Sequence, residues 1–188
     1  MNVLALSLLL AASPAGAQSF TVDPAASSVT YHVVHKLHRV DGRTSTLEGK
    51  AVLQPDGKLL AMVRAPVSSF DSGDRNRDTH MLEVMEASRF PFVVVKGVAQ
   101  LEGGLLAVAQ KATTADVKLQ AEVELHGVKE PMTIPLTVEL RPDGTARVKG
   151  AFEVSLERHQ IERPSLLFVK IDDACKVDVD LVARAAKP

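Results

Sequence analysis

Residues 117–125 read VKLQAEVEL, and apolar and polar side chains alternate through the whole stretch. A period of two places the apolar side chains on one face of a β-strand and the polar ones on the other. This pattern is typical of an antiparallel sheet with one face on a core and the other in water. Residues 28–33 (SVTYHV) and 176–181 (KVDVDL) repeat it. Because a period of two, not 3.6, dominates the chain after residue 17, the sequence predicts an all-β domain.

Two turns of similar composition separate such strands: Gln54-Pro55-Asp56-Gly57 and Arg141-Pro142-Asp143-Gly144. In turns of this kind proline presets the first central φ, aspartate caps the turn and glycine accepts a positive φ. Both turns therefore predict tight hairpins. We expect a third hairpin around Glu102-Gly103-Gly104.

These signals together predict an eight-stranded antiparallel barrel, because closure removes the sheet edges that invite aggregation. The strands are expected near residues 28–36, 44–54, 57–67, 91–101, 115–126, 130–141, 145–156 and 174–185. A barrel of eight strands has room for packed side chains or for one small ligand. Residues 74–87 (DRNRDTHMLEVMEA) lack the alternation, and the sequence predicts a short helical segment there that caps one end of the barrel.

The first 17 residues differ from the rest of the chain. An apolar run over residues 3–12 is followed by Pro14 and by Ala15-Gly16-Ala17. This is the form of a secretory signal peptide, with cleavage expected between Ala17 and Gln18. The sequence thus predicts a signal peptide over residues 1–17, a barrel domain over residues 18–188, and a periplasmic or secreted location. The apolar run is too short for stable membrane insertion. A retained anchor or a buried N-terminal helix is the alternative.

Composition excludes nucleic acid as a partner. The 188 residues carry 22 basic and 23 acidic side chains, and aromatic residues make up 4% with no Trp. Such a chain offers neither a basic patch nor stacking platforms for bases. Cys175 is the single cysteine and lies in an alternating run, so we interpret it as a small buried structural residue.

The histidines and carboxylates give no strong catalytic signal. His32, His35 and His38 lie close in sequence, but His32 and His35 point to opposite faces of a strand, so a metal site is only an alternative interpretation. The segment from Asp71 to His80 is the densest polar group. We interpret its aspartates as caps of turns and of a helix, and a cation site or an acid–base pair as the alternative.

Five segments together resemble the signature of the YceI-like family. They are VTYHVVH (29–35), SSFDSGD (68–74), RDTHM (77–81), RFP (89–91) and ELHGVKEPM (124–132), and the resemblance extends from about residue 20 to the C-terminus. Two segments depart from the family pattern. Gly49-Lys50-Ala51 lacks an aromatic residue that members often carry, and residues 156–163 replace the usual Asp-Phe-Gly-Ile.

The resemblance implies a lipocalin-like barrel in the bacterial periplasm that binds a long apolar molecule in a central cavity. It implies no cofactor; the expected ligand is a polyisoprenoid such as a quinone, or an acyl lipid. For such a barrel the candidate ligand-binding residues are Tyr31, Val33, His35, Phe70, His80, Met81, Phe92, Val94, Phe152 and Phe168.

The sequence therefore predicts a carrier of an apolar small molecule. The motifs of hydrolases, phosphate loops and paired-cysteine metal sites are absent, so we assign no catalytic residue and no metal ligand. One alternative is a metal-dependent or acid–base periplasmic enzyme that uses His35, Asp78 and His80. Another is an envelope stress-related interaction module without a ligand. The oligomeric state stays open, and a homodimer is compatible with the sequence.

Overall fold

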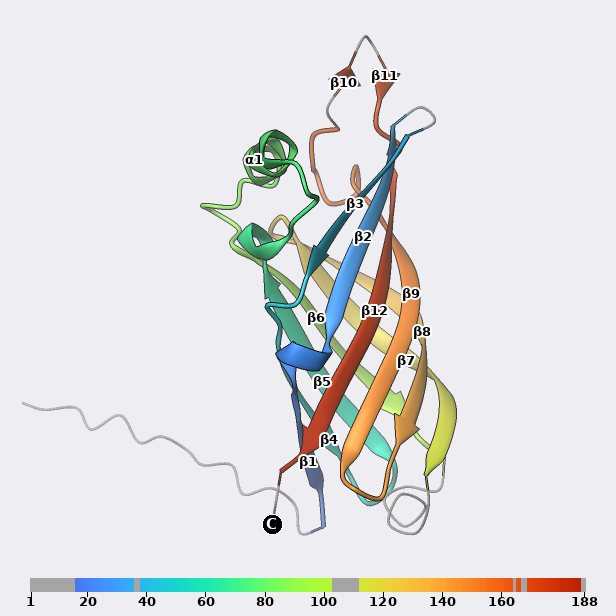
Figure 1. Cartoon of the computed structure of the whole chain (residues 1–188). Helices are drawn as coiled ribbons and strands as arrows, with labels where there is room; N and C mark the ends of the chain where they lie inside the picture. The colour runs from blue at the N-terminus through green and yellow to red at the C-terminus, as the bar shows by residue number, and fades with distance from the viewer. Residues whose placement is uncertain (1–15, 36–37, 103–111, 164, 167–168, 187–188) are drawn as a thin grey trace, which may run out of the picture.

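The structure is a computed structural model that describes residues 16–35, 38–102, 112–163, 165–166 and 169–186 (Figure 1). Its main sheet contains ten antiparallel strands. They are β1 (Gln18–Val22), β2 (Ser28–His35), β3 (His38–Thr44), β4 (Glu48–Leu53), β5 (Lys58–Pro66), β6 (Phe92–Gln100), β7 (Thr113–Leu125), β8 (Val128–Leu140), β9 (Thr145–Ser155) and β12 (Ala174–Ala185). Two short strands, β10 (Ser165–Leu166) and β11 (Val169–Lys170), pair separately.

Eight of the ten strands form a closed ring, in the order β1-β4-β5-β6-β7-β8-β9-β12, and pairing between β1 and β12 closes it. The predicted antiparallel barrel is therefore confirmed. One strand of the ring differs from the prediction. The predicted strand near residues 28–36 exists as β2, but β2 and β3 form a hairpin that extends the sheet from β12. Its position in the ring is taken by β1, which is only five residues long.

Local chemistry explains the strands and the turns. Along β7 the buried residues alternate with exposed ones, so that Val117, Leu119 and Val123 face the interior. The two predicted hairpins are present: Gly57 and Gly144 have φ of 86° and 80°. Each glycine N–H donates to the carbonyl oxygen three residues earlier, at 3.0 Å. The turn expected at residues 102–104 extends into residues that the structure does not describe.

The helical segment is also confirmed, as α1 (Arg75–Val84), and the short 3-10 helices η1 (Pro24–Ala26) and η2 (Val67–Ser69) accompany it. The Asp74 carboxylate caps α1, because it accepts hydrogen bonds from the backbone N–H groups of Asn76 and Arg77 at 2.9 and 3.2 Å. Among the described residues, none of the helices has the length and apolar character that crossing a membrane requires. Cleavage after Ala17 stays a prediction.

Candidate ligand cavity

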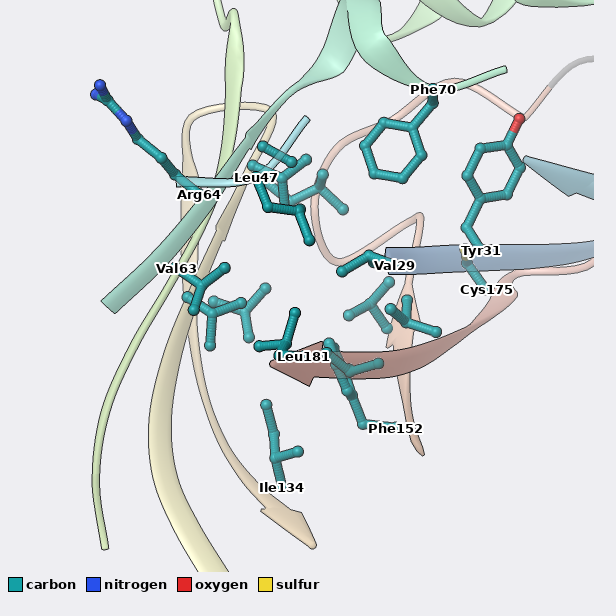
Figure 2. A pocket seen from close by; sticks show the side chains of 18 of the residues that line it. Val29, Tyr31, Leu47, Val63, Arg64, Phe70, Ile134, Phe152, Cys175 and Leu181 are labelled. Atoms are coloured by element: carbon teal, nitrogen blue, oxygen red, sulfur yellow. The ribbon is translucent and has the colours of Figure 1, made fainter. Parts of the chain in front are cut away.

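A cavity of about 570 Å³ lies inside the barrel. This volume falls within the range of about 300–1,000 Å³ that is usual for small-molecule sites. The wall comes from inward-facing side chains of the barrel strands, and most of these are aliphatic. Figure 2 shows Val29, Val63, Leu181, Phe152 and Ile134 around the common space.

The barrel interior is hollow partly because some residues that lie opposite one another on neighbouring strands have very small side chains. In one such cross-strand row Ala61 of β5 lies between Ala51 of β4 and Gly97 of β6. Beyond Ala61 the row is packed: a Cβ atom on Gly97 would come within 2.7 Å of Leu119 Cγ, and Ala121 of β7, which lies opposite Gly97, is buried. Ala51 and Ala61 line the cavity. Side chains this short leave open the volume that larger residues would fill in a packed barrel.

Two aromatic side chains lie side by side on the wall. The rings of Tyr31 and Phe70 have centroids 5.6 Å apart and are tilted by 49° (Figure 2). Tyr31 also lies against Gly42 on β3, where a Cβ atom would come within 2.3 Å of Tyr31 Cε1. The glycine is therefore required for the position of the ring. The Tyr31 hydroxyl has no hydrogen-bond partner among the described residues, and burial raises its pKa to about 12. It is a protonated donor at neutral pH.

Part of the polar lining comes from α1. Arg77 and His80 of α1 line the cavity together with the apolar Met81, and Glu162 also belongs to the lining. Arg77 is oriented by Ser72: its Nε donates to Ser72 Oγ at 2.9 Å. The cavity thus joins a long apolar wall to a small polar part, which suits an amphipathic ligand with an apolar chain.

Two charged residues, Lys50 of β4 and Arg64 of β5, also belong to the cavity lining, although both alternate along their strands with inward-facing neighbours. The last pair between β1 and β4 joins Thr21 with Lys50, and β4 extends beyond it. Figure 2 shows Arg64 directed away from the cavity; its Nη2 lies 2.6 Å from Glu48 Oε2.

Six of the ten candidate residues lie on the cavity wall: Tyr31, Val33, Phe70, His80, Met81 and Phe152. Their contact with a ligand stays a prediction. The side chain of His35 and the whole of Phe168 lie outside the described residues. Arg77 and Glu162 also line the cavity, although neither is among the ten candidate residues.

The placement of Phe92 and Val94 on the wall was wrong. Neither lines the cavity; their neighbours Val93 and Val95 do. The guanidinium of Arg64 lies 4.6 Å above the Phe92 ring. The physical reason is the continuous apolar run FVVV, in which no polar residue shows which face is inside, and a shift of one residue exchanges the faces.

The two residues of the enzyme alternative whose side chains the structure describes, Asp78 and His80, do not pair with each other. The Asp78 carboxylate accepts hydrogen bonds from the N–H and the hydroxyl of Ser72, at 3.1 and 2.6 Å. His80 Nδ1 lies 3.4 Å from Glu83 Oε2. Asp78 and His80 are two residues apart on α1 and so face different directions. The interpretation of Asp74 and Asp78 as local caps is therefore confirmed.

Three of the described histidines, His32, His126 and His159, have structural partners. His32 lies between two carboxylates of neighbouring strands, 2.7 Å from Asp41 and 2.8 Å from Asp178. His159 is fully buried, and its Nδ1 donates to the Ser155 carbonyl at 2.9 Å. His126 Nδ1 in turn donates to the His159 carbonyl at 3.1 Å. Within the described ranges, no group of three or more His, Cys, Asp or Glu residues is placed to hold a metal ion.

Cys175 is buried on the cavity wall, as the sequence predicts for a structural residue. Burial raises the pKa of its thiol to about 11. Since the thiolate is the reactive form, a thiol with this pKa is a poor nucleophile at neutral pH.

The family model of the YceI-like domain matches residues 20–183. Among solved structures, a polyisoprenoid binding domain from Saccharophagus degradans, implicated in plant cell wall breakdown, superposes with a TM-score of 0.69 at 19% identity, covering 89% of this chain and 98% of that one. BcnA of Burkholderia cenocepacia gives 0.71 at 17% identity, with coverage of 86% and 98%. The Campylobacter jejuni YceI protein gives 0.59 at 10% identity, with coverage of 81% and 88%. A search of curated proteins found no match. At these identities the structural likeness shows the fold alone.

Proposed function

Because the chain belongs to the YceI-like family, we propose that it is a binding protein that holds a long apolar molecule in the barrel cavity. The ligand class is a polyisoprenoid, an isoprenoid quinone or a fatty-acid-like chain, carried in the periplasm or outside the cell. The observation that carries this proposal is the cavity of about 570 Å³ with its largely aliphatic wall. A relative, the domain from Saccharophagus degradans, is described as polyisoprenoid binding.

Burial of the ligand's apolar chain alone supplies enough free energy for binding. Each buried methylene contributes about 0.8 kcal/mol, so a five-carbon isoprene unit contributes roughly 4 kcal/mol. Micromolar affinity needs about 8 kcal/mol, and association itself costs at least ~4 kcal/mol. About three units in the cavity therefore reach micromolar affinity without a polar contact.

The polar part of the wall sets the orientation of the ligand. Tyr31 offers a hydroxyl donor that no described residue accepts, and Arg77 and His80 offer a cation and an imidazole on the wall near it. We infer that an oxygen-bearing head group lies here and that the chain extends along the aliphatic wall. The cavity volume argues against an interaction module with a filled core.

The direct test is organic extraction of the protein purified from a bacterial host, combined with native mass spectrometry. We expect a bound molecule with a prenyl or acyl chain, or uptake of such a molecule by the ligand-free protein. A folded barrel that neither carries nor accepts such a chain refutes the proposal.

The Tyr31→Phe variant tests the orientation. It keeps the ring but removes the hydroxyl, and a neutral hydrogen bond contributes about 1 kcal/mol. We expect an isoprenoid quinone to bind roughly 5-fold more weakly and squalene, a hydrocarbon without a head group, to bind unchanged. Equal weakening of both ligands would place the effect on the shape of the wall instead.

A further inference from the structure

The three large apolar side chains that are exposed in the described part of the chain lie together on the outside of the barrel. They are Leu60, Met62 and Val98, with exposed fractions of 38%, 39% and 37%. Leu60 lies directly opposite Val98 in the pairing of β5 with β6, and Met62 follows Leu60 on the same face. We name these three residues the outer apolar face. Exposed apolar side chains that lie together inside a polar rim are a feature of surfaces that contact proteins or membranes.

Three lysines surround the outer apolar face. Lys50 of β4 and Lys96 of β6 both lie opposite Met62, one on each side. Lys58 is two residues before Leu60 on the same face of β5. None of these lysines has an ion-pair partner among the described residues. The rim is therefore positively charged.

Acidic side chains beside the rim offset part of its charge. Glu122 lies opposite Lys96, and Glu122 and Glu124 share Lys129 Nζ at 3.6 and 3.8 Å, which leaves one negative charge. The Asp56 carboxylate accepts the Lys58 N–H at 3.0 Å, and Glu48 of β4 pairs with Arg64. Three lysines against two uncompensated carboxylates leave the rim with a net positive charge.

From this arrangement we propose that the outer apolar face docks on the surface of an anionic lipid membrane. Apolar side chains enter the boundary between head groups and acyl chains, while lysine stems lie along them and the ammonium groups stay at the phosphates. Anionic head groups attract each lysine near the surface. A second copy of the chain fits less well, because a symmetric dimer through this face would bring two positive rims together.

Docking in this way would also bring two cavity-lining residues to the membrane. Lys50 belongs both to the rim and to the cavity lining, and Arg64 lines the cavity two residues after Met62. A molecule leaving the acyl region would meet the cavity beside the docked face. The docking itself goes beyond the proposed function, because it does not depend on what the cavity holds.

The absence of tryptophan from the sequence allows a local test. Met62→Trp places a single indole on the outer apolar face. The matched control is Ala151→Trp, at an exposed outward position of β9 opposite Asp178. Both variants keep the same N-terminus, so any binding through the apolar run of residues 3–12 is common to them. The probes are vesicles of phosphatidylcholine alone, or mixed in equal parts with phosphatidylglycerol.

We expect the emission of Met62→Trp to shift to the blue on the mixed vesicles and to be quenched by brominated acyl chains, and that of Ala151→Trp to stay unchanged. Replacing Lys50, Lys58 and Lys96 by Gln should weaken the binding on the order of 100-fold. Leu60→Trp repeats the measurement on the same face should Met62→Trp disturb the fold.

Two results would overturn the proposal. One is an emission of Met62→Trp that the mixed vesicles leave unchanged, or that changes no more than the emission of Ala151→Trp. The other is a blue shift without lipid that rises with protein concentration together with a doubled mass, since a second copy would then cover the face. Ligand extraction is measured separately, so failure of docking and failure of ligand binding are distinguishable.

Discussion

Replacing Ala61 by Leu should stabilise the ligand-free protein and weaken ligand binding at the same time. Ala61 is half-buried because its side chain faces the open cavity. Leucine adds three carbon atoms to this wall. At about 0.8 kcal/mol per methylene, their burial contributes roughly 2.4 kcal/mol, from which the ordering of the leucine rotamer subtracts about 0.5–1 kcal/mol. The free energy of unfolding should therefore rise by about 1.5 kcal/mol.

The same three carbon atoms exclude three carbon atoms of the ligand chain. The corresponding loss of about 2.4 kcal/mol weakens binding on the order of 50-fold. The free energy of unfolding is measured by urea denaturation of the delipidated protein, and the affinity by titration with the fluorescent fatty acid cis-parinaric acid. The two quantities should move in opposite directions.

Ala121→Leu is the matched control, because Ala121 is buried at 7% exposure and does not belong to the cavity lining. Overpacking a filled site costs about 1–3 kcal/mol, so this variant should be destabilised and should keep most of its affinity. If Ala61→Leu is destabilised to the same degree, the wall near Ala61 is packed and the argument for a hollow barrel is refuted.

Three further predictions follow from single residues. Cys175, with a thiol pKa of about 11 in place of 9.0, should react with Ellman's reagent at pH 8 about 100-fold more slowly in the folded protein than in urea, and the folded rate should rise with pH; equal rates would show an accessible thiol. Gly42→Ala should destabilise the protein by about 1–3 kcal/mol in urea denaturation, because its Cβ would lie 2.3 Å from Tyr31 Cε1; an unchanged midpoint would mean that the ring moves freely. Asp74→Ala should lower the Tm by about 2–4 °C through loss of the cap of α1, whereas Asp74→Asn should keep a Tm near the wild-type value. An equal fall of the Tm in both variants would show that it does not come from loss of the cap.

The hairpins and the helix could be predicted because their signals are local. A turn such as Arg141-Pro142-Asp143-Gly144 contains its own conformational preferences, and the alternation of β7 is long enough to fix its inner face. Asp74 stands directly before the first residue of α1, which is the position of an N-cap. Each of these features depends on contacts within a few residues of the chain.

Closure of the ring could not be predicted in the same way. β1 pairs with β4 through Gln18–Thr21 and with β12 through Phe20–Val22, whose partners include Ala185. The pairing with β12 joins the two ends of the described barrel. The strand β1 directly follows the small residues of the expected cleavage site. With only five residues, it is too short for an alternating pattern to be recognised. The ring therefore depends on long-range pairing, which the local pattern does not encode.

The strand β5 shows why the candidate site and the outer apolar face were both hard to predict. Its sequence, KLLAMVRAP, carries apolar residues at odd and even positions alike. A strand that is apolar on both faces usually indicates a strand buried on both faces. Here only one face is inside, where Ala61 and Val63 line the cavity, while Leu60 and Met62 face water. Because an antiparallel barrel of this kind needs apolar residues only on its inner face, the outer ones are not explained by the fold. A role outside the barrel, such as contact with a membrane, accounts for them.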